Sequence, residues 1–331
     1  MPAHQSTGHG GAGDSVALRC LDQLFSDPSA KAKHDCGPPM PLQFLPDEKL
    51  YQSYDHYAQE FAPTFPAHTD DIIFHWYWSG PISELHLFSL KSLLLTQTPP
   101  YSLRIWCPPE QLTERLHALA DLARLNVVDI QPFDPRGEAQ GTPYDGLTEL
   151  LEPDTVVLRG DEFRAIALFK YGGVYVDPDV LMLKDLRPLL SVEFCYAWAL
   201  EPYANSAVLR LHAGSANAHS LLLRGGRAHT FHPRMVFRYT DSDSWPEPMH
   251  VLPSFVFDPA WVGHDSHLAA TAYCTTFDDF FNMRREMTLS AFFPHSFAYH
   301  WHKRWNTSLQ EGSIAWHLKR EVDDLFERHF G

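Results

Sequence analysis

The sequence predicts an α/β fold in which a mostly parallel sheet carries helices on both faces. Short apolar runs rich in β-branched and aromatic residues alternate with longer segments whose leucines recur at helical spacing. Strands and helices that alternate at these lengths are typical of parallel sheets. With 331 residues and 44% hydrophobic content, the chain is long enough to bury such a core as one large domain.

Three strands and two helices are predicted in the first half of the chain. The run IIFHWYWSG after Asp71 predicts the first strand, which stops at Gly80 and Pro81. A leucine-rich helix is predicted next, over residues 82–95. Pro81 favours its start, because proline is well tolerated in the first turn of a helix. The remaining elements of this half are a strand over 102–106, a helix over 111–125, a strand over 126–130 and a loop over 132–153.

The second half begins with a helix predicted over residues 161–171. It ends at Gly172, because glycine tolerates the positive φ that helix C-termini often require, and an apolar strand follows over 174–176. The remaining elements are strands over 194–200 and 206–211, an irregular region over 226–260 and an amphipathic helix over 313–330 that covers the core.

Composition divides the chain into a leader and a folded domain. Residues 1–45 are rich in Gly, Ser, Pro, Ala and His and predict a flexible leader, so the domain is expected over 46–331. Five scattered cysteines predict reduced thiols, although Cys20 and Cys36 could pair. No apolar run approaches the roughly 20 residues of a membrane span, and no signal peptide is present, so we expect a soluble cytoplasmic protein.

The net charge of −15 bears on the partners of the protein. No basic cluster interrupts the acidic balance, and phosphate backbones are bound by concentrated Lys and Arg, so nucleic acid is not expected as a partner. An acidic protein that handles a smaller anionic ligand would need a metal ion and local cationic side chains at its site.

Two aspartates follow the predicted strand over 174–176. Asp177 and Asp179 should point the same way, because side chains alternate along an extended chain, and Pro178 stiffens the link between them. Ligands of open α/β sheets bind at the carboxyl ends of strands, and paired carboxylates suit a hard divalent cation that also takes phosphate oxygens. The pattern therefore predicts a metal site here.

Asp161 and Arg164 lie three residues apart on the preceding helix and share a face. They could be an N-cap and its ion-pair partner, or groups that bind a ligand. The chain reads D-x-x-R, about a dozen residues, and then G-G-V-Y-x-D-x-D. This block resembles the DXD-containing glycosyltransferase family of yeast initiation mannosyltransferases, α1,4-galactosyltransferases and glucosylating clostridial toxins. The matching residues are Asp161, Arg164, Gly172, Gly173, Val174, Tyr175, Asp177 and Asp179.

The resemblance implies a GT-A-type, Rossmann-like catalytic domain over 46–331 with C-terminal helical and loop additions. It also implies transfer of a hexose from a UDP- or GDP-sugar to a hydroxyl of a glycan, lipid or protein acceptor, with retention of configuration. Eukaryotic members are usually anchored Golgi proteins, so a Golgi lumen location is the alternative if an anchor is missing from this sequence.

Roles for five residues follow from the resemblance. Asp179 would bind Mn²⁺ or Mg²⁺ directly, and Asp177 would act through water or the ribose. Asp161 and Arg164 would fix the sugar hydroxyls, and Tyr175 would line the donor pocket.

Two further candidates come from shorter matches. The family typically opens with I-H-x-I-W-x-G, and here His75, Trp78 and Gly80 match, so Trp78 either stacks on the donor base or is a core tryptophan. Asn205 precedes a short apolar strand and either faces the donor sugar or serves only the turn.

The closing segment, residues 296–308, partly matches the family's A-x-H-x-W or H-x-x-x-x-W element. His300 could complete the metal shell, with Lys303 or Arg304 on the diphosphate, or it could be a packed core histidine. If this segment folds over the donor, His300 and Trp305 should lie near Asp179.

Two other functional hypotheses for residues 161–179 stay open at this point. The run VYVDPDV also resembles a haloacid-dehalogenase-like phosphatase, with Asp177 as nucleophile and Asp179 as acid, although that motif normally opens its fold. A catalytically silent nucleotide-sugar-binding module is the third possibility.

Overall fold

The computed structural model describes residues 65–66, 68, 70–147, 156–198, 201–238, 245–260, 273–274 and 276–331. The predicted leader over 1–45, with Cys20 and Cys36, lies outside these ranges, as does the proposed domain boundary. Cys107, Cys195 and Cys274 are buried and form no disulfide bond among the described residues.

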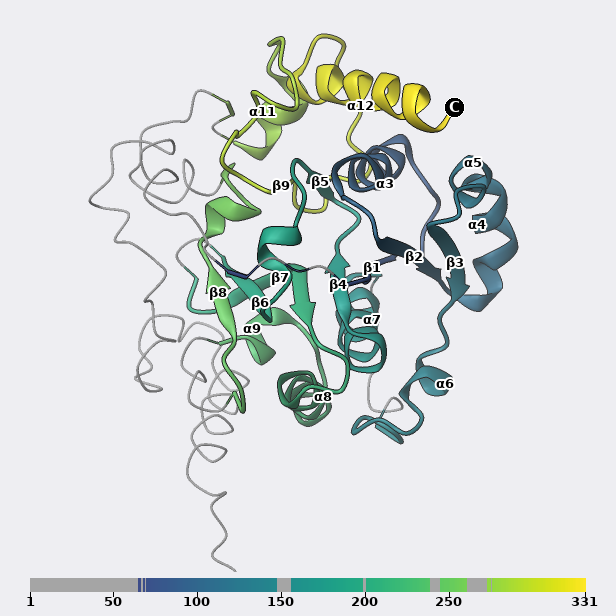
Figure 1. The fold of residues 1–331 in the computed structure, drawn as a ribbon, viewed down its shortest axis with the longest axis vertical. Coiled ribbons are helices and arrows are strands. Elements are labelled where there is room, and N and C mark those ends of the chain that lie inside the picture. Colours follow the sequence, from purple (N-terminus) through teal and green to yellow (C-terminus); the bar gives the residue numbers. More distant parts are fainter. Residues whose placement is uncertain are drawn as a thin grey trace, which may run out of the picture.

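A seven-stranded sheet with the order β3-β2-β1-β4-β7-β6-β8 forms the centre of the molecule (Figure 1). Its strands are β1 (Ile72–Tyr77), β2 (Tyr101–Cys107), β3 (Val128–Pro132), β4 (Gly173–Val176), β6 (Phe194–Ala197), β7 (Ala204–Leu211) and β8 (His250–Leu252). Only β7 is antiparallel to its neighbours, β4 and β6, while the other pairs are parallel. The predicted mostly parallel sheet is therefore confirmed.

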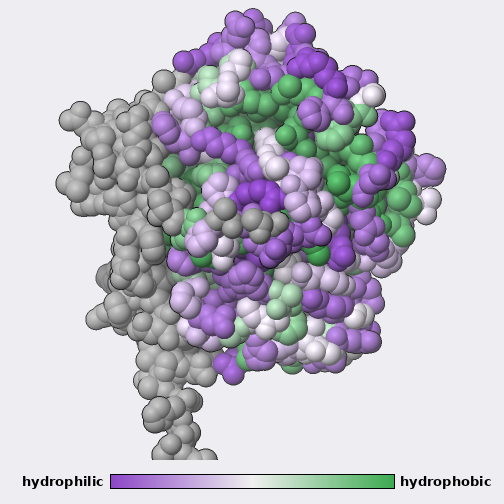
Figure 2. Space-filling view, viewed as in Figure 1, coloured by the Kyte–Doolittle hydropathy of each residue, from purple (hydrophilic) through white to green (hydrophobic). Residues whose placement is uncertain are grey.

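Helices cover both faces of this sheet, with α3 and α12 on one side and α7 and α8 on the other (Figure 1). The α-helices are α3 (Glu84–Thr96), α4 (Leu112–Ala118), α5 (Ala120–Ala123), α6 (Pro135–Ala139), α7 (Val156–Tyr171), α8 (Ala216–Ala228), α9 (Pro233–Val236), α11 (Phe277–Asn282) and α12 (Ile314–Phe330). Figure 2 shows hydrophilic residues along the edge of the molecule at which α12 lies in Figure 1. The helix buries Ile314, Ala315, Leu318, Val322 and Phe326, as expected for an amphipathic helix. Within the described ranges, no helix is both long and apolar enough to cross a membrane.

Several predicted boundaries were wrong. Helix α3 begins at Glu84 rather than directly after Pro81, because Ser83 is its N-cap and forms a capping box with His86. The helix predicted over 111–125 is broken at Leu119 into α4 and α5. The region expected to be irregular from residue 226 instead begins with the end of α8 and also contains α9 and β8.

A small second sheet was not predicted. Strand β5 (Val180–Met182) pairs antiparallel with β9 (Ala298–His300), and Val180 lies opposite His300. Three-residue strands carry no periodicity that a sequence pattern can detect. This pairing fixes the closing segment beside the two aspartates that follow β4.

The Gly172-Gly173 pair allows β4 to approach its neighbour closely. Gly173 has φ +98°, and a Cβ atom there would lie 2.1 Å from the carbonyl oxygen of Ile73 on β1. Any larger residue would therefore push apart the two strands whose ends carry the site.

His75, fully buried on β1, is held as a neutral imidazole. Its Nδ1 accepts a hydrogen bond from Trp106 Nε1 at 3.2 Å, so Nε2 carries the proton and donates to the Gly172 carbonyl at 2.8 Å. Burial lowers the pKa of His75 to about 4.

This shift predicts acid sensitivity of the fold. Between pH 6.5 and 4 the unfolded chain binds a proton at His75 that the folded chain does not, so stability falls as the pH falls. The loss from this one group is on the order of 3 kcal/mol over that window. Urea unfolding at several pH values should show a shallower pH dependence in His75→Gln than in the wild type. Equal slopes would contradict the neutral, buried state of His75.

Candidate active site

A cavity of about 290 Å³ lies where β1 and β4 end, and the closing segment forms part of its wall. Nine residues predicted from the sequence line it: Trp78, Asp161, Arg164, Tyr175, Asp177, Asp179, Asn205, His300 and Lys303. Helix α7, strand β4 and the segment after β9 therefore converge on one space, at the end of the sheet where α/β proteins bind ligands.

Arg164 is the centre of a buried polar network on α7. Its Nη2 contacts Asp161 Oδ1 at 2.6 Å and Asp177 Oδ1 at 3.3 Å, and its Nη1 donates to the hydroxyl of Ser206 at 2.6 Å. The guanidinium also lies 4.6 Å from the ring centre of Tyr175, whose hydroxyl donates to Asp177 Oδ1 at 2.6 Å. One cation thus fixes two carboxylates against the cavity.

Asp161 is not an N-cap, since α7 begins at Val156. Its burial raises the pKa of this carboxyl to about 7, although Arg164 opposes the shift. Burial likewise raises the pKa of Asp177 above its usual range, again against the pull of Arg164. Asp161 Oδ2 is buried and has no hydrogen-bond partner among the described residues.

Asp179 is held by the closing segment. Its Oδ1 lies 3.3 Å from His300 Nε2, and its Oδ2 accepts a hydrogen bond from the backbone N–H of Lys303 at 2.6 Å, 124 residues away in sequence. Burial alone would raise the pKa of Asp179, but His300 and the Lys303 N–H lower it below its usual range. Burial would lower the pKa of His300, yet the Asp179 carboxylate raises it to about 10.

The segment after β9 has an unusual backbone. His302 and Lys303 have φ values of +51° and +61°, in the left-handed region that non-glycine residues rarely occupy. These two residues present the Lys303 N–H to Asp179 and the His302 ring to the space beside His300. Strained positions of this kind tend to occur at functional sites, where the surrounding contacts stabilise them.

Three of the predicted residues could hold a metal ion. One ligand atom each from Asp177, Asp179 and His300 lie within 4.8 Å of one another. Two carboxylates and an imidazole suit Mn²⁺, and the carboxylates also suit Mg²⁺. These three ligand residues therefore fit the divalent ion, Mn²⁺ or Mg²⁺, that the sequence predicts.

Trp78 and Asn205 differ in part from expectation. Trp78 is a buried core residue that also lines the cavity, and its ring packs 4.5 Å from His86 and 4.9 Å from Trp305. Asn205 lies within β7 rather than in a turn, and its Nδ2 is buried without a hydrogen-bond partner among the described residues. The proposed roles of both toward the donor remain predictions.

Only one of the two cationic candidates in the closing segment lines the cavity. Lys303 lines the cavity, whereas Arg304 donates to Asp278 Oδ1 at 2.8 Å and packs over Phe277. Trp305 also lines the cavity, and its carbonyl accepts a hydrogen bond from the Ser83 hydroxyl at 3.2 Å. The closing segment is thus docked onto the start of α3.

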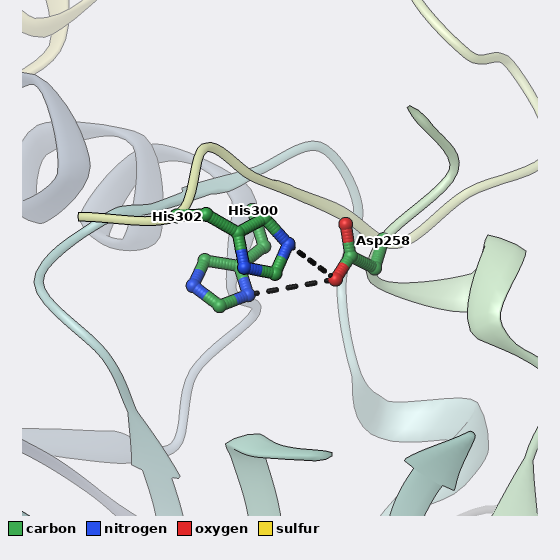
Figure 3. Close-up of side chains that lie close together, drawn as sticks. All are labelled: Asp258, His300 and His302. Atoms are coloured by element: carbon green, nitrogen blue, oxygen red, sulfur yellow. Dashed lines mark hydrogen bonds and ion pairs between the residues drawn. The ribbon is translucent and has the colours of Figure 1, made fainter. Parts of the chain in front are cut away.

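Sequence reasoning missed the groups behind His300. Tyr196 Oη lies 3.1 Å from His300 Nδ1. Asp258 Oδ2 contacts both His300 Nδ1 and His302 Nε2 (Figure 3). The alternation His300-x-His302 could have indicated a second histidine on the same side of the chain. Asp258, a lone aspartate after an apolar run, gave no comparable signal.

Residues 150–195 match the family described as "glycosyltransferase sugar-binding region containing DXD motif". The matched range contains the Asp161–Arg164 pair and both aspartates after β4. This part of the chain is therefore similar to the DXD-motif sugar-binding region of glycosyltransferases. The match favours the glycosyltransferase prediction over the phosphatase interpretation.

No curated protein matches this sequence. Among solved structures, the galactosyltransferase LgtC in complex with donor and acceptor sugar analogues is similar with a TM-score of 0.47 and 11% identity, over 78% of this chain and 96% of that one. Mouse xyloside xylosyltransferase 1 in its apo form is similar with a TM-score of 0.41 and 14% identity, over 56% of this chain and 86% of that one. The PaToxG glycosyltransferase is similar with a TM-score of 0.40 and 12% identity, over 70% of this chain and 77% of that one.

Glycosyltransferase activity implies a nucleotide-sugar donor and an acceptor. Regions of the DXD type typically bind a divalent metal ion.

Proposed function

We propose that the protein is a metal-dependent hexosyltransferase that moves a hexose from a UDP- or GDP-sugar to an acceptor hydroxyl with retention of configuration. The observation that carries the proposal is the presence of two sets of groups in one cavity. Asp177, Asp179 and His300 offer metal ligands, and the Asp161–Arg164 pair lies beside them.

Asp179 and His300 would hold Mn²⁺ or Mg²⁺ directly, with Asp177 acting through water or the ribose. When bound, the ion would supply positive charge to the leaving diphosphate. Metal-bound histidines usually donate their other ring N–H to an oxygen, which fixes the ring. Tyr196 and Asp258 offer such oxygens at His300 Nδ1, at 3.1 and 3.6 Å.

Asp161 and Asn205 offer complementary groups to a sugar. The buried Oδ2 of Asp161 is an acceptor without a partner among the described residues, and Asn205 Nδ2 is a donor in the same condition. Buried polar atoms left unpaired cost about 1–3 kcal/mol each, so hydroxyls that satisfy both would gain affinity and orientation. Arg164 keeps the Asp161 carboxylate in place through its Oδ1.

Aromatic and cationic groups complete the donor site. Tyr77, Trp78 and Trp305 line the cavity and offer faces for a nucleotide base. The exposed Lys303 would reach the diphosphate. Retention requires no separate nucleophile if the leaving phosphate assists the incoming hydroxyl.

Slow donor hydrolysis tests the proposal, because it needs no acceptor. With a panel of UDP- and GDP-hexoses and Mn²⁺, we expect one donor to be cleaved, and chelation with EDTA should abolish the reaction. NMR taken before mutarotation should show a free hexose with the anomeric configuration of the donor. Cleavage that survives chelation would contradict the metal, and release of the opposite anomer would contradict retention.

A further inference from the structure

Asp258, His300 and His302 form a buried cluster behind the DXD aspartates. Asp258 Oδ2 lies 2.7 Å from His302 Nε2 and 3.6 Å from His300 Nδ1, and the two imidazole rings stack with centroids 3.8 Å apart. Figure 3 shows one nitrogen of each ring directed at the same carboxylate oxygen. All three ligand atoms lie within 4.8 Å of one another.

Separate parts of the chain hold these side chains in place. His300 ends β9, and His302 follows it with left-handed backbone that brings its ring over His300. Asp258 follows a 3-10 turn, and its N–H donates to the Ser254 carbonyl at 2.7 Å. The side chains are 0%, 7% and 14% exposed for Asp258, His300 and His302, so the cluster is largely shielded from solvent.

We propose that Asp258, His300 and His302 form a second cation site that takes Zn²⁺ or a similar borderline-soft ion and thereby inhibits the enzyme. Two imidazoles and one carboxylate are ligands that Zn²⁺ prefers, with bonds of about 2.0–2.1 Å to nitrogen. Tetrahedral bonds of that length separate ligand atoms by about 3.3 Å, close to the 2.7 and 3.6 Å contacts present. A water could take the fourth position, since both histidines line the cavity.

The inhibition follows from the two nitrogens of His300 and rests on the proposed function. Nε2 faces Asp179 and the DXD site, whereas Nδ1 faces Asp258. A neutral imidazole has one N–H and one lone pair, so only one nitrogen can bind a metal. With Zn²⁺ on Nδ1, Nε2 must carry the proton and donate it to Asp179. His300 is then lost as a ligand for the catalytic ion.

Zn²⁺ affinity measured by calorimetry on the full chain, without nucleotide, tests the site itself. His302→Gln and Asp258→Asn should each weaken the tightest Zn²⁺ binding at least tenfold, since even groups outside the first shell of a metal are worth about 10–100-fold. The matched control is His117→Gln, which removes an exposed histidine of α4 and should leave that affinity unchanged. His302 is partly exposed, so its variant is informative even if Asp258→Asn folds poorly.

Displacement of Mn²⁺, followed by its EPR signal, tests the competition. Zn²⁺ should release Mn²⁺ from the wild type at concentrations at least tenfold lower than from His302→Gln, which keeps Asp177, Asp179 and His300. Unchanged Zn²⁺ affinity in both cluster variants would overturn the proposal, as would loss of tight Zn²⁺ binding in Asp177→Asn. If the wild type bound Zn²⁺ through the cluster but never bound Mn²⁺, the proposed function would fail while the second site stood.

Discussion

Arg164→Ala is expected to lower the free energy of unfolding by about 3–5 kcal/mol, because it leaves buried carboxylates without their cation. The guanidinium lies 2.6 Å from Asp161 and 3.3 Å from Asp177, and the side chains of Arg164 and Asp161 are only 7% and 3% exposed. Water cannot replace the lost partner at that depth. Urea unfolding followed by circular dichroism measures the effect.

An exposed pair of the same chemistry provides the control. Arg124 contacts Asp121 at 3.0 Å, but their side chains are 75% and 87% exposed, so Arg124→Ala should cost less than about 1 kcal/mol. Adding Asp161→Asn to Arg164→Ala should restore part of the stability, because it removes one uncompensated charge. Similar small losses in Arg164→Ala and Arg124→Ala would mean that the network is solvated and the description of the site is wrong.

The central block could be predicted because its information is local. The Gly-Gly pair, the strand that follows it and the two aspartates lie within a few residues, and backbone geometry fixes their relation. The same holds for the i, i+3 pair of Asp161 and Arg164, although only the structure shows that it is buried and lines the cavity.

The other half of the site depends on contacts between distant segments. His300 reaches Asp179 because β9 pairs with β5, and three residues per strand give no periodicity to recognise. Asp258 lies just after a 3-10 turn, in a part of the chain where composition predicted only irregular structure. Such pairings are set by packing of the whole domain. The sequence therefore indicated which residues line the cavity but not which groups support them.

Asp179→Asn is expected to reduce hexosyl transfer and donor hydrolysis by about 10³-fold or more while the protein stays folded. A metal ion supplies several kcal/mol of charge stabilisation, and each 1.36 kcal/mol is a factor of ten in rate. Asparagine keeps the shape of the side chain and an oxygen that can still accept the Lys303 N–H. What it removes is the negative charge that faces His300 and the proposed ion.

The measurement combines Mn²⁺ titration, turnover and thermal melting of Asp179→Asn. Mn²⁺ affinity and turnover should fall together. The loss of stability should stay below that of Arg164→Ala, because His300 keeps the Asp258 carboxylate 3.6 Å from its Nδ1. Asp134→Asn is a matched control, because Asp134 caps α6 away from the cavity and asparagine caps a helix about as well. Wild-type turnover in Asp179→Asn would rule out its role as a metal ligand, whereas a collapse of melting temperature would show that the charge is needed for the fold instead.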